Sequence, residues 1–266
     1  MVTGADGFIG SNLVQLLEET CRCRVKRLDR RKHHLILPAS LAPLLNGADV
    51  VIHLAGKNRG SKLTLFRGNA LATLGLLEGI SSYCPGTKLI FASSILVYSP
   101  ESYYGLTKRI AEQLIRQYSG ISVNGVVLRL SNVYGPLGRP HYNSVIATFA
   151  HMIRARREFV VHGNGTQTRD YLFVRDAVNA IIKAIDYEPK SGFETFDICS
   201  GKKTSLNTIV HTLESVVGHK VAFRYEGRED TVGLKVHLDC GRARKTLKWR
   251  PETSLGEGLR TVMSAT

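Results

Sequence analysis

Three residues near the middle of the chain have the types and the spacing needed to move a proton on an alcohol. Tyr104 and Lys108 are four positions apart, so on a helix they share one face, and Ser94 ends an apolar run ten positions before Tyr104. A lysine ammonium lowers the pKa of a neighbouring phenol, and a serine hydroxyl can hydrogen-bond the same substrate oxygen. We therefore predict that Ser94, Tyr104 and Lys108 exchange a proton with a hydroxyl group while a hydride moves to or from a nicotinamide.

A glycine-rich segment at the start of the chain is typical of a turn that holds a pyrophosphate. The segment Thr3-Gly4-Ala5-Asp6-Gly7-Phe8-Ile9-Gly10 lets the backbone approach an anion, and a helix from Ser11 would present its amides and the positive end of its dipole. By itself the pattern also fits a glycine-rich turn that binds nothing. The predicted cofactor contacts in this turn are Gly4, Gly7, Phe8, Ile9 and Gly10.

Asp29 comes about twenty residues after the glycines, where a carboxylate can accept hydrogen bonds from both ribose hydroxyls of an adenosine. This residue favours NAD as the cofactor. Arg30 and Arg31 follow directly and could instead hold the 2′-phosphate of NADP, so NADP stays open. A solvated charged loop is the alternative interpretation of this segment.

The apolar run over 50–54 leads into two small residues, Ala55 and Gly56, against which a flat ring and a ribose can lie. We therefore add Leu54, Ala55 and Gly56 to the predicted cofactor contacts. His53 lies inside this run, and we expect it to be a core residue with satisfied hydrogen bonds rather than a catalyst.

The elements that must position these residues alternate between short β-rich runs and amphipathic helical stretches, which indicates a parallel sheet with helices on both faces. The predicted strands cover residues 24–28, 50–54, 89–92, 126–130 and 196–199. The predicted helices cover residues 11–19, 69–83, 104–118, 144–156, 174–186 and 205–217. Only two residues precede the glycine turn, so we expect a short first strand that leaves backbone groups of its neighbours unpaired.

The predicted fold class is α/β, a Rossmann doubly wound parallel sheet with a small C-terminal α/β substrate lobe. An NAD(P)-binding domain would cover residues 1–132, with 171–200 returning to it. The substrate-binding lobe would cover residues 133–170 and 201–266.

Amino-acid composition and charge limit the kinds of ligand and partner that the protein can be expected to bind. Of the 266 residues, 43% are hydrophobic and 22% are charged, as in ordinary globular proteins. The net charge of +14 suits an anionic ligand, but the densest basic cluster, over 22–34, lacks interleaved aromatic residues, so we expect no nucleic-acid partner. Without a long apolar run or an export signal, we expect no membrane association and a cytoplasmic location. The five cysteines, Cys21 and Cys23 included, lack the spacing of a metal site, so we expect no metal.

Together these motifs resemble the extended short-chain dehydrogenase/reductase superfamily, in its NAD-dependent epimerase/dehydratase group. The resemblance covers nearly the whole chain through TGADGFIG, DVVIHLAG, FASSILVY, YGLTK, RLSNVYGP, GNGTQTRDYLFVRDA and WRPETSLGEGL. It implies that Ser94, Tyr104 and Lys108 are the catalytic triad, and that Asn69 and Lys108 also contact the cofactor.

The resemblance also implies a nucleoside-diphosphate sugar as the substrate. Asn132, Arg169 and Arg228 match positions that hold its diphosphate, and a guanidinium suits two phosphate oxygens. A structural ion pair is the alternative for each arginine. The resemblance further implies a homodimer formed by the helices that start near Asn69 and Tyr104; these helices carry apolar residues at helical spacing, Leu71, Leu74, Ile110 and Leu114.

Two departures from the family pattern narrow the reaction. Ile95 and Leu96 follow Ser94, where dehydratases and decarboxylases carry an acidic residue, so we do not expect elimination of water. The link between Ser94 and Tyr104 is less than half as long as in typical epimerases and, with HLAGKNR and RPHYNSVIATF, is similar to capsular-polysaccharide reductases of 4-keto amino-sugar nucleotides. The leading hypothesis is a 4-epimerase that retains NAD. The alternatives are an NADPH-dependent 4-keto-sugar reductase and a catalytically inactive dinucleotide-binding relative.

Overall fold

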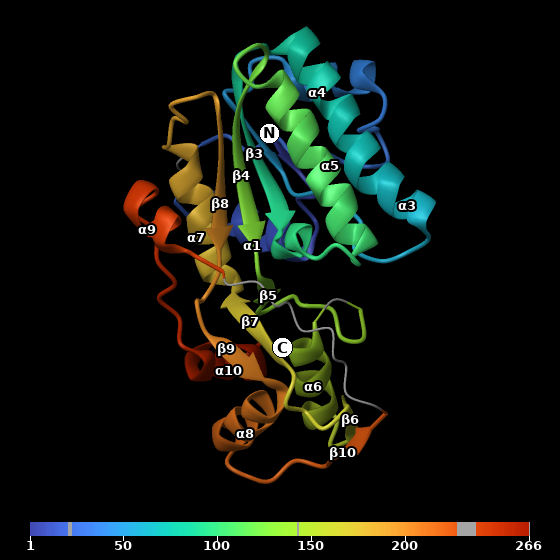
Figure 1. The fold of residues 1–266 in the computed structure, drawn as a ribbon, viewed down its shortest axis with the longest axis vertical. Helices are drawn as coiled ribbons and strands as arrows, with labels where there is room; N and C mark the ends of the chain where they lie inside the picture. The colour runs from blue at the N-terminus through green and yellow to red at the C-terminus, as the bar shows by residue number, and fades with distance from the viewer. Residues whose placement is uncertain (21–22, 143, 228–237, 266) are drawn as a thin grey trace.

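Within the part of the chain that the structure describes, the main sheet contains five parallel strands. The computed structural model describes residues 1–20, 23–142, 144–227 and 238–265. The strands lie in the order β1-β2-β3-β4-β8, and Figure 1 shows β3, β4 and β8 side by side in the upper part of the molecule. Their bounds are β1 (Val2–Thr3), β2 (Val50–His53), β3 (Thr87–Ser94), β4 (Val123–Leu130) and β8 (Phe193–Ile198).

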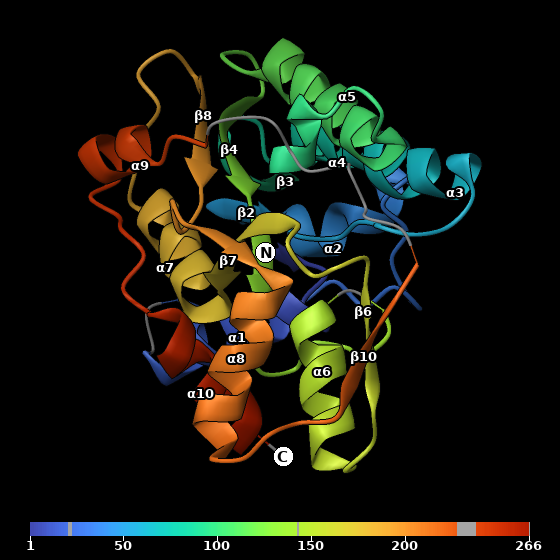
Figure 2. The ribbon, with the colours of Figure 1, turned by 60° about the horizontal axis from the view of Figure 1, so that its bottom comes forward.

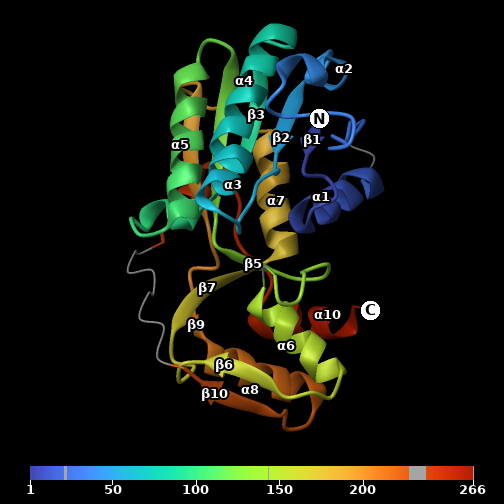
Figure 3. The same ribbon diagram turned by 90° about the vertical axis from the view of Figure 1, so that its right-hand side faces the viewer.

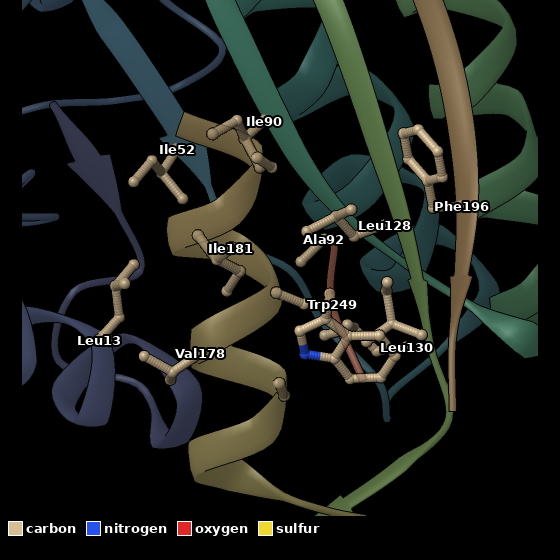
Figure 4. Close-up of a cluster of buried hydrophobic side chains, with 14 of the residues drawn as sticks. Leu13, Ile52, Ile90, Ala92, Leu128, Leu130, Val178, Ile181, Phe196 and Trp249 are labelled. Carbon is tan, nitrogen blue, oxygen red and sulfur yellow. The ribbon is translucent and has the colours of Figure 1, made fainter. Parts of the chain in front are cut away.

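Helices cover both faces of this sheet, so the predicted doubly wound α/β fold is confirmed (Figure 3). One face carries α1 (Phe8–Glu19) and α7 (Val174–Ile185), and the other carries α4 (Ala72–Tyr83) and α5 (Tyr103–Tyr118). The buried face of α7 includes Val178 and Ile181, whose spacing suits a helix that lies on a sheet. Figure 4 shows these side chains beside Ile90 and Leu128 of the sheet.

The strand predicted over 24–28 does not form as a regular strand. Arg27 makes an isolated parallel bridge with Val2. The amide of Val2 donates to the carbonyl of Lys26 (2.8 Å), and the amide of Leu28 donates to the carbonyl of Val2 (2.9 Å). The first strand is as short as expected, and a two-residue strand leaves room for only a short ladder on its outer side.

The helix predicted over 69–83 begins with a wide π-helical turn, η2 (Arg67–Leu71), which continues into α4. Wide turns of this kind are common at functional sites. The remaining short elements beside this part of the sheet are η1 (Pro38–Leu41), α2 (Ala42–Leu45), α3 (Lys62–Phe66) and η3 (Ile95–Tyr98).

A second hydrophobic core lies beyond the carboxyl ends of β3 and β4, in the lower part of Figure 1. Figure 2 shows its helices and strands from below. One sheet in this part contains the three strands β5 (Asn132–Tyr134), β7 (Thr168–Phe173) and β9 (Lys203–Ser205). A separate sheet contains the two strands β6 (Phe159–His162) and β10 (Phe223–Glu226). The helices of this part are α6 (Val145–Arg154), α8 (Leu206–Val217) and α10 (Leu255–Ser264).

The segment around α9 (Gly241–Thr246) packs back onto the main sheet. Ala243, Leu247 and Trp249 belong to the core beneath α1 and α7, and the indole of Trp249 donates to the carbonyl of Asp176 (2.9 Å). The domain boundaries proposed above, at 132/133, 170/171 and 200/201, stay a prediction. Among the described helices, none is long and apolar enough to cross a membrane.

Candidate active site

The glycine turn between β1 and α1 is so tightly packed that larger residues do not fit. Gly4 has a φ of +69°, and a Cβ on it would lie 2.7 Å from the amide nitrogen of Ala55. A Cβ on Gly10 would overlap the carbonyl oxygen of Gly4. Gly7 precedes α1 and has no side chain that could cap the helix, so the amides of the first turn face outward from a narrow backbone loop. Phe8 and Ile9 contribute their amides to that turn. These residues fit a bound pyrophosphate.

Asp29 lies beside this turn, because the backbone of Leu28 pairs with Val2. Its carboxylate accepts a hydrogen bond from the amide of Arg31 (2.9 Å), and this bond lowers the pKa of Asp29. The carboxylate is therefore ionised at neutral pH and suited to accept ribose hydroxyls. Arg30 and Arg31 are exposed, so the arrangement also leaves room for the 2′-phosphate of NADP.

The end of β2 brings predicted residues from three parts of the chain together. The amide of Leu54 donates to the carbonyl of Thr3 (3.2 Å), which places 54–56 directly beside the glycine turn. A Cβ on Gly56 would lie 2.9 Å from Asn69 Oδ1 and 3.3 Å from Lys108 Nζ. The predicted cofactor contacts after β2 thus lie against both Asn69 and the lysine of the triad.

Asn69 uses its amide group to hold the loop after β2. Its Oδ1 accepts from the amide of Lys57 (2.8 Å), and its Nδ2 donates to the carbonyl of Lys57 (2.8 Å) and to Thr107 Oγ1 (2.9 Å). With these bonds Asn69 connects the loop to α5. Its direct contact with the cofactor stays a prediction.

Ser94, Tyr104 and Lys108 meet at the carboxyl end of β3. Ser94 is the last residue of β3 and Tyr104 lies in the first turn of α5, close enough for the Ser94 hydroxyl to influence the pKa of the Tyr104 phenol. One turn later Lys108 is buried, donates from Nζ to the carbonyl of Ala92 (2.8 Å) and lies 4.5 Å from the centre of the Phe91 ring.

The electrostatics of this trio differ from one expectation. Burial raises the pKa of Tyr104 to about 12, and the hydroxyl of Ser94 acts in the opposite direction. The expected lowering of this pKa by Lys108 is not seen, and the Lys108 ammonium donates to the carbonyl of Ala92. Burial lowers the pKa of Lys108 itself to about 8, against the opposite effect of Glu112.

The sequence motifs did not predict a buried ion pair that lies behind the trio. Glu112 is 1% exposed and pairs with Arg129 (2.6 Å), and it also accepts from the hydroxyl of Ser93 (2.5 Å). Arg129 donates to the hydroxyl of Tyr98 (2.6 Å), which in turn donates to Asp197 (2.8 Å). The network fixes the end of β3 to α5 and β4. Lys108 and Glu112 are four residues apart, so they share one face of the helix. This spacing was the signal in the sequence that Glu112 lies near the trio.

Two of the predicted substrate residues, Asn132 and Arg169, lie on the strands β5 and β7. Leu130 pairs with Ser94, and Asn132 follows two residues later, with its Nδ2 donating to the carbonyl of Asp170 (2.9 Å). Arg169 lies on the neighbouring strand β7.

The Asp170 carboxylate accepts from the amide and hydroxyl of Ser200 and from the amide of Gly201. The alternative of a structural ion pair for Arg169 stays open. Arg228 lies outside the described residues, so its predicted role stays a prediction.

His53 is a core residue with satisfied hydrogen bonds, as expected. It is fully buried and bonded to Thr3 and Thr73, and burial lowers its pKa to about 3. In the ranges that the structure describes, no group of three or more His, Cys, Asp or Glu side chains could hold a metal ion. Cys23 is exposed, and Cys21 lies outside those ranges.

Curated relatives cover most of this chain. A protein of Bacillus subtilis named as an uncharacterized UDP-glucose epimerase is 30% identical, over 97% of this chain and 87% of that protein. The UDP-glucose 4-epimerase of Mycolicibacterium smegmatis is 28% identical, over 97% and 95%. A UDP-2-acetamido-2,6-beta-L-arabino-hexul-4-ose reductase of Pseudomonas aeruginosa is 35% identical, over 70% of this chain and 49% of that protein.

Two solved structures are also similar. MoeE5 in complex with UDP-glucose and NAD has a TM-score of 0.85 and 27% identity, over 98% of this chain and 96% of that chain. RMD from Pseudomonas aeruginosa complexed with NADPH has a TM-score of 0.86 over 99% and 96%; at 24% identity it supports the fold alone.

The model of the NAD dependent epimerase/dehydratase family matches residues 1–199. This match agrees with the glycine turn, with the trio at the end of β3 and with the resemblance seen in the motifs. It also confirms, at the level of the family, the expectation of an enzyme with a nicotinamide dinucleotide cofactor. The chain therefore belongs to the NAD dependent epimerase/dehydratase family.

Proposed function

We propose that this chain is an NAD-dependent nucleoside-diphosphate-sugar 4-epimerase whose catalytic residues are Ser94, Tyr104 and Lys108. The observation that carries the proposal is the meeting of these side chains at the carboxyl end of β3, beside Gly56 and the glycine turn. Ligands of open α/β sheets bind at this edge.

In the proposed reaction Tyr104 acts in its phenolate form, which the positive charge of a bound oxidised nicotinamide would favour; the phenolate oxygen takes the proton of the C4 hydroxyl and later returns it. The bound nicotinamide supplies the hydride acceptor and donor. Ser94 hydrogen-bonds the same substrate oxygen. Lys108 keeps a positive charge beside the reacting groups at neutral pH, because its pKa of about 8 still favours the ammonium form. Return of the hydride to the opposite face of the 4-keto sugar would give the epimer, with no net change in the cofactor.

Ile95, the residue after Ser94, fits this proposal because it is buried and apolar. Elimination of water from the sugar needs a second acid or base at the neighbouring carbon, and neither Ile95 nor Leu96 can supply one. An epimerase needs only one proton-transfer group, which is Tyr104 here.

The proposed substrate is a nucleoside-diphosphate sugar bound between the edge of the main sheet and β5 and β7. Asn132 and Arg169 lie on these strands, and the relatives named above are epimerases and reductases of UDP sugars. With Arg228, they are the proposed diphosphate ligands. A guanidinium can bridge two phosphate oxygens.

A one-way reductase of 4-keto-sugar nucleotides with NADPH is the second candidate. The relative with the higher identity, 35%, is named as such a reductase, although it shares a smaller part of the chain. The same trio serves this reaction, with Tyr104 as the proton donor. Its pKa of about 12 suits a donor.

The experiment that tests the proposal is incubation of the purified protein with a panel of nucleoside-diphosphate sugars, with NAD and NADPH added separately. We expect the C4 epimer to form with no net change in the absorbance of reduced nicotinamide. Stoichiometric loss of NADPH on a 4-keto sugar, with no epimer, would support the reductase instead. A protein that binds dinucleotide without any substrate-dependent spectral change, or that does not bind it at all, would be the inactive relative.

We also propose a homodimer formed by the outer faces of α4 and α5. Leu71, Leu74, Ile110 and Leu114 remain half-buried in a single chain, and Ile110 and Leu114 line a shallow hollow on α5. Apolar residues around a hollow suit burial against a second copy. Light scattering on the size-exclusion peak is expected to give twice the mass of the chain, and a monomer at all concentrations would contradict the dimer.

A further inference from the structure

A continuous series of hydrogen bonds runs through His53 beneath the candidate site. Thr3 Oγ1 and His53 Nδ1 are 2.7 Å apart, and His53 Nε2 and Thr73 Oγ1 are 3.1 Å apart. The Thr73 hydroxyl donates to the carbonyl of Asn69 (2.7 Å), and Thr3 Oγ1 accepts from the amide of Ala55 (3.2 Å). Thr3, His53 and Thr73 are each 0% exposed.

The chemistry of these groups assigns every proton in the series. An amide nitrogen can only donate, so Thr3 accepts from Ala55 and turns its own proton toward His53 Nδ1. A carbonyl can only accept, so the proton of Thr73 goes to Asn69, and Thr73 must accept from His53 Nε2. The imidazole is therefore neutral, with its proton on Nε2. A second proton on Nδ1 would leave the hydroxyl proton of Thr3 without an acceptor in this buried series.

The two ends of the series hold different parts of the candidate site. Thr3 is the residue before Gly4, and Ala55 is the residue before Gly56, so one end fixes the backbone beneath the proposed cofactor. The other end fixes the π-helical turn that presents Asn69, whose side chain connects the loop after β2 to α5.

The ring of Phe91 contacts both His53 and Lys108. His53 stacks on Phe91 with a distance of 5.4 Å between ring centres, and Lys108 Nζ lies 4.5 Å from the centre of the Phe91 ring. A neutral imidazole is compatible with this neighbour, whereas an imidazolium would place a second buried cation close to the lysine.

We propose that His53 is a positioning residue which, as the neutral Nε2–H tautomer, sets the backbone of the glycine turn against the π-helical turn of Asn69. This inference rests on the proposed function, because it assigns His53 to the alignment of the proposed cofactor with Tyr104 and Lys108. His53 does not touch the reacting atoms in this proposal. Its effect is on the distance between the groups that do.

The first test is the tautomer itself, measured by long-range ¹H–¹⁵N correlation spectra of labelled protein. The His53→Phe variant identifies the signals of His53 among the nine histidines. We expect a protonated Nε2 and an unprotonated Nδ1 that stay unchanged through neutral pH. A Nδ1–H tautomer, or titration near the ordinary histidine pKa, would overturn the assignment. This readout needs neither cofactor nor substrate, so it holds even if the proposed function fails.

The second test compares His53→Phe, Thr73→Val and the double variant. The phenylalanine keeps a ring against Phe91 and removes both nitrogens, and the valine keeps the shape of the threonine. Thr87→Val is the matched control, because Thr87 is a buried threonine bonded to the carbonyls of Ala48 and Cys84 at the far end of β3.

We expect NADH affinity or kcat to fall on the order of tenfold or more in both single variants, since small misplacements of reacting groups are costly. The double variant is expected to lose no more than the worse single variant, because both interrupt one series. Thr87→Val is expected to lose stability only. If His53→Phe and Thr73→Val lose stability but bind NADH and turn over as the control does, His53 is merely structural and the proposal is wrong. If wild-type protein binds no dinucleotide, the proposed function fails instead.

Discussion

Gly105 packs against the carbonyl oxygen of Leu96 so closely that a Cβ on this glycine would overlap that oxygen. The contact explains how only ten positions can separate Ser94 from Tyr104. The 3-10 turn η3 lies directly under the first turn of α5, and the missing side chain of Gly105 lets the phenol of Tyr104 reach Ser94.

Replacement of Gly105 by alanine is therefore expected to push the start of α5 away from η3. Overpacking of this kind costs about 1 to 3 kcal/mol of stability, and a shift of about 1 Å at Tyr104 would lower kcat on the order of a hundredfold. Gly256→Ala is the control, since a Cβ at Gly256 meets nothing within 4 Å. Urea unfolding and kcat are measured for both variants, and equal behaviour of the two would refute the role of this contact.

Tyr104→Phe removes only the phenol oxygen that we assign to proton transfer. Its kcat is expected to fall by about 10² to 10⁴, while NADH binding stays near the wild-type value, because the ring still fills its place. Tyr103→Phe is the matched control on the same turn, where the tyrosine ring lies 5.7 Å from the ammonium of Lys62. Full activity in Tyr104→Phe would remove Tyr104 from the mechanism.

Asp29→Ala tests which dinucleotide the protein prefers. Without the carboxylate, the ribose hydroxyls lose their acceptor, and a 2′-phosphate no longer meets a negative charge beside Arg30 and Arg31. The ratio of NADPH affinity to NADH affinity, measured by fluorescence titration, is expected to rise about tenfold or more. The ratio serves as its own control for general damage, and an unchanged ratio would exclude Asp29 from cofactor selection.

The lysine of the trio is expected to leave a signature in the pH dependence of stability. Burial lowers the pKa of Lys108 from 10.5 to about 8, so as pH rises the folded protein releases this proton before the unfolded chain does. Between these values the unfolded chain binds more protons, and the contribution of Lys108 to the free energy of unfolding rises with pH; below about 8 the full cost of burying the charge is present.

Urea unfolding across this range isolates the lysine when wild type is compared with Lys108→Met. The difference in free energy of unfolding, wild type minus variant, is expected to increase from pH 8 to pH 10.5. Activity of wild type is expected to decline over the same range as the ammonium is lost. A flat difference would mean that Lys108 titrates normally in the folded protein.

The motifs predicted the parts of the site that depend on local chain geometry. The glycine turn needs the backbone of Gly4 and Gly10 for close packing, and such requirements act over a few residues. The four-residue spacing of Tyr104 and Lys108 on a helix is likewise local. These features leave their mark in the sequence because almost no other residue types satisfy them.

Features that depend on distant partners could not be predicted in the same way. Only a single bridge forms in place of the strand expected over 24–28, because its partner β1 has two residues. The length of a strand depends on how many residues its partner offers for pairing. The bonds of Asn69 to Lys57 and Thr107, and the direction of the Lys108 ammonium, are decided by tertiary packing. The sequence shows that a lysine is present, but it does not show which carbonyl group the ammonium will contact in the folded protein.

The buried pair of Glu112 and Arg129 carries the last prediction, since it fixes β3 and β4 to α5 close to the trio. Glu112 is 1% exposed and accepts from Ser93 as well as from Arg129, so Glu112→Gln leaves the guanidinium without its counter-charge. Breaking one partner of a buried pair costs about 3 to 5 kcal/mol, and the exposed fraction of Arg129, 20%, places the expected loss at the low end, about 3 kcal/mol.

Arg224 and Glu158 form the control pair, with side chains 56% and 47% exposed. Arg224→Met is expected to cost less than about 1 kcal/mol. The double variant of Glu112→Gln and Arg129→Met is expected to be more stable than the sum of the single losses predicts, because it removes the stranded charge. Its kcat should nonetheless fall below that of Arg224→Met, since the end of β3 that carries Ser94 loses its attachment to α5. A loss of stability in the double variant equal to the sum of the two single losses would show that Glu112 and Arg129 do not act as a pair.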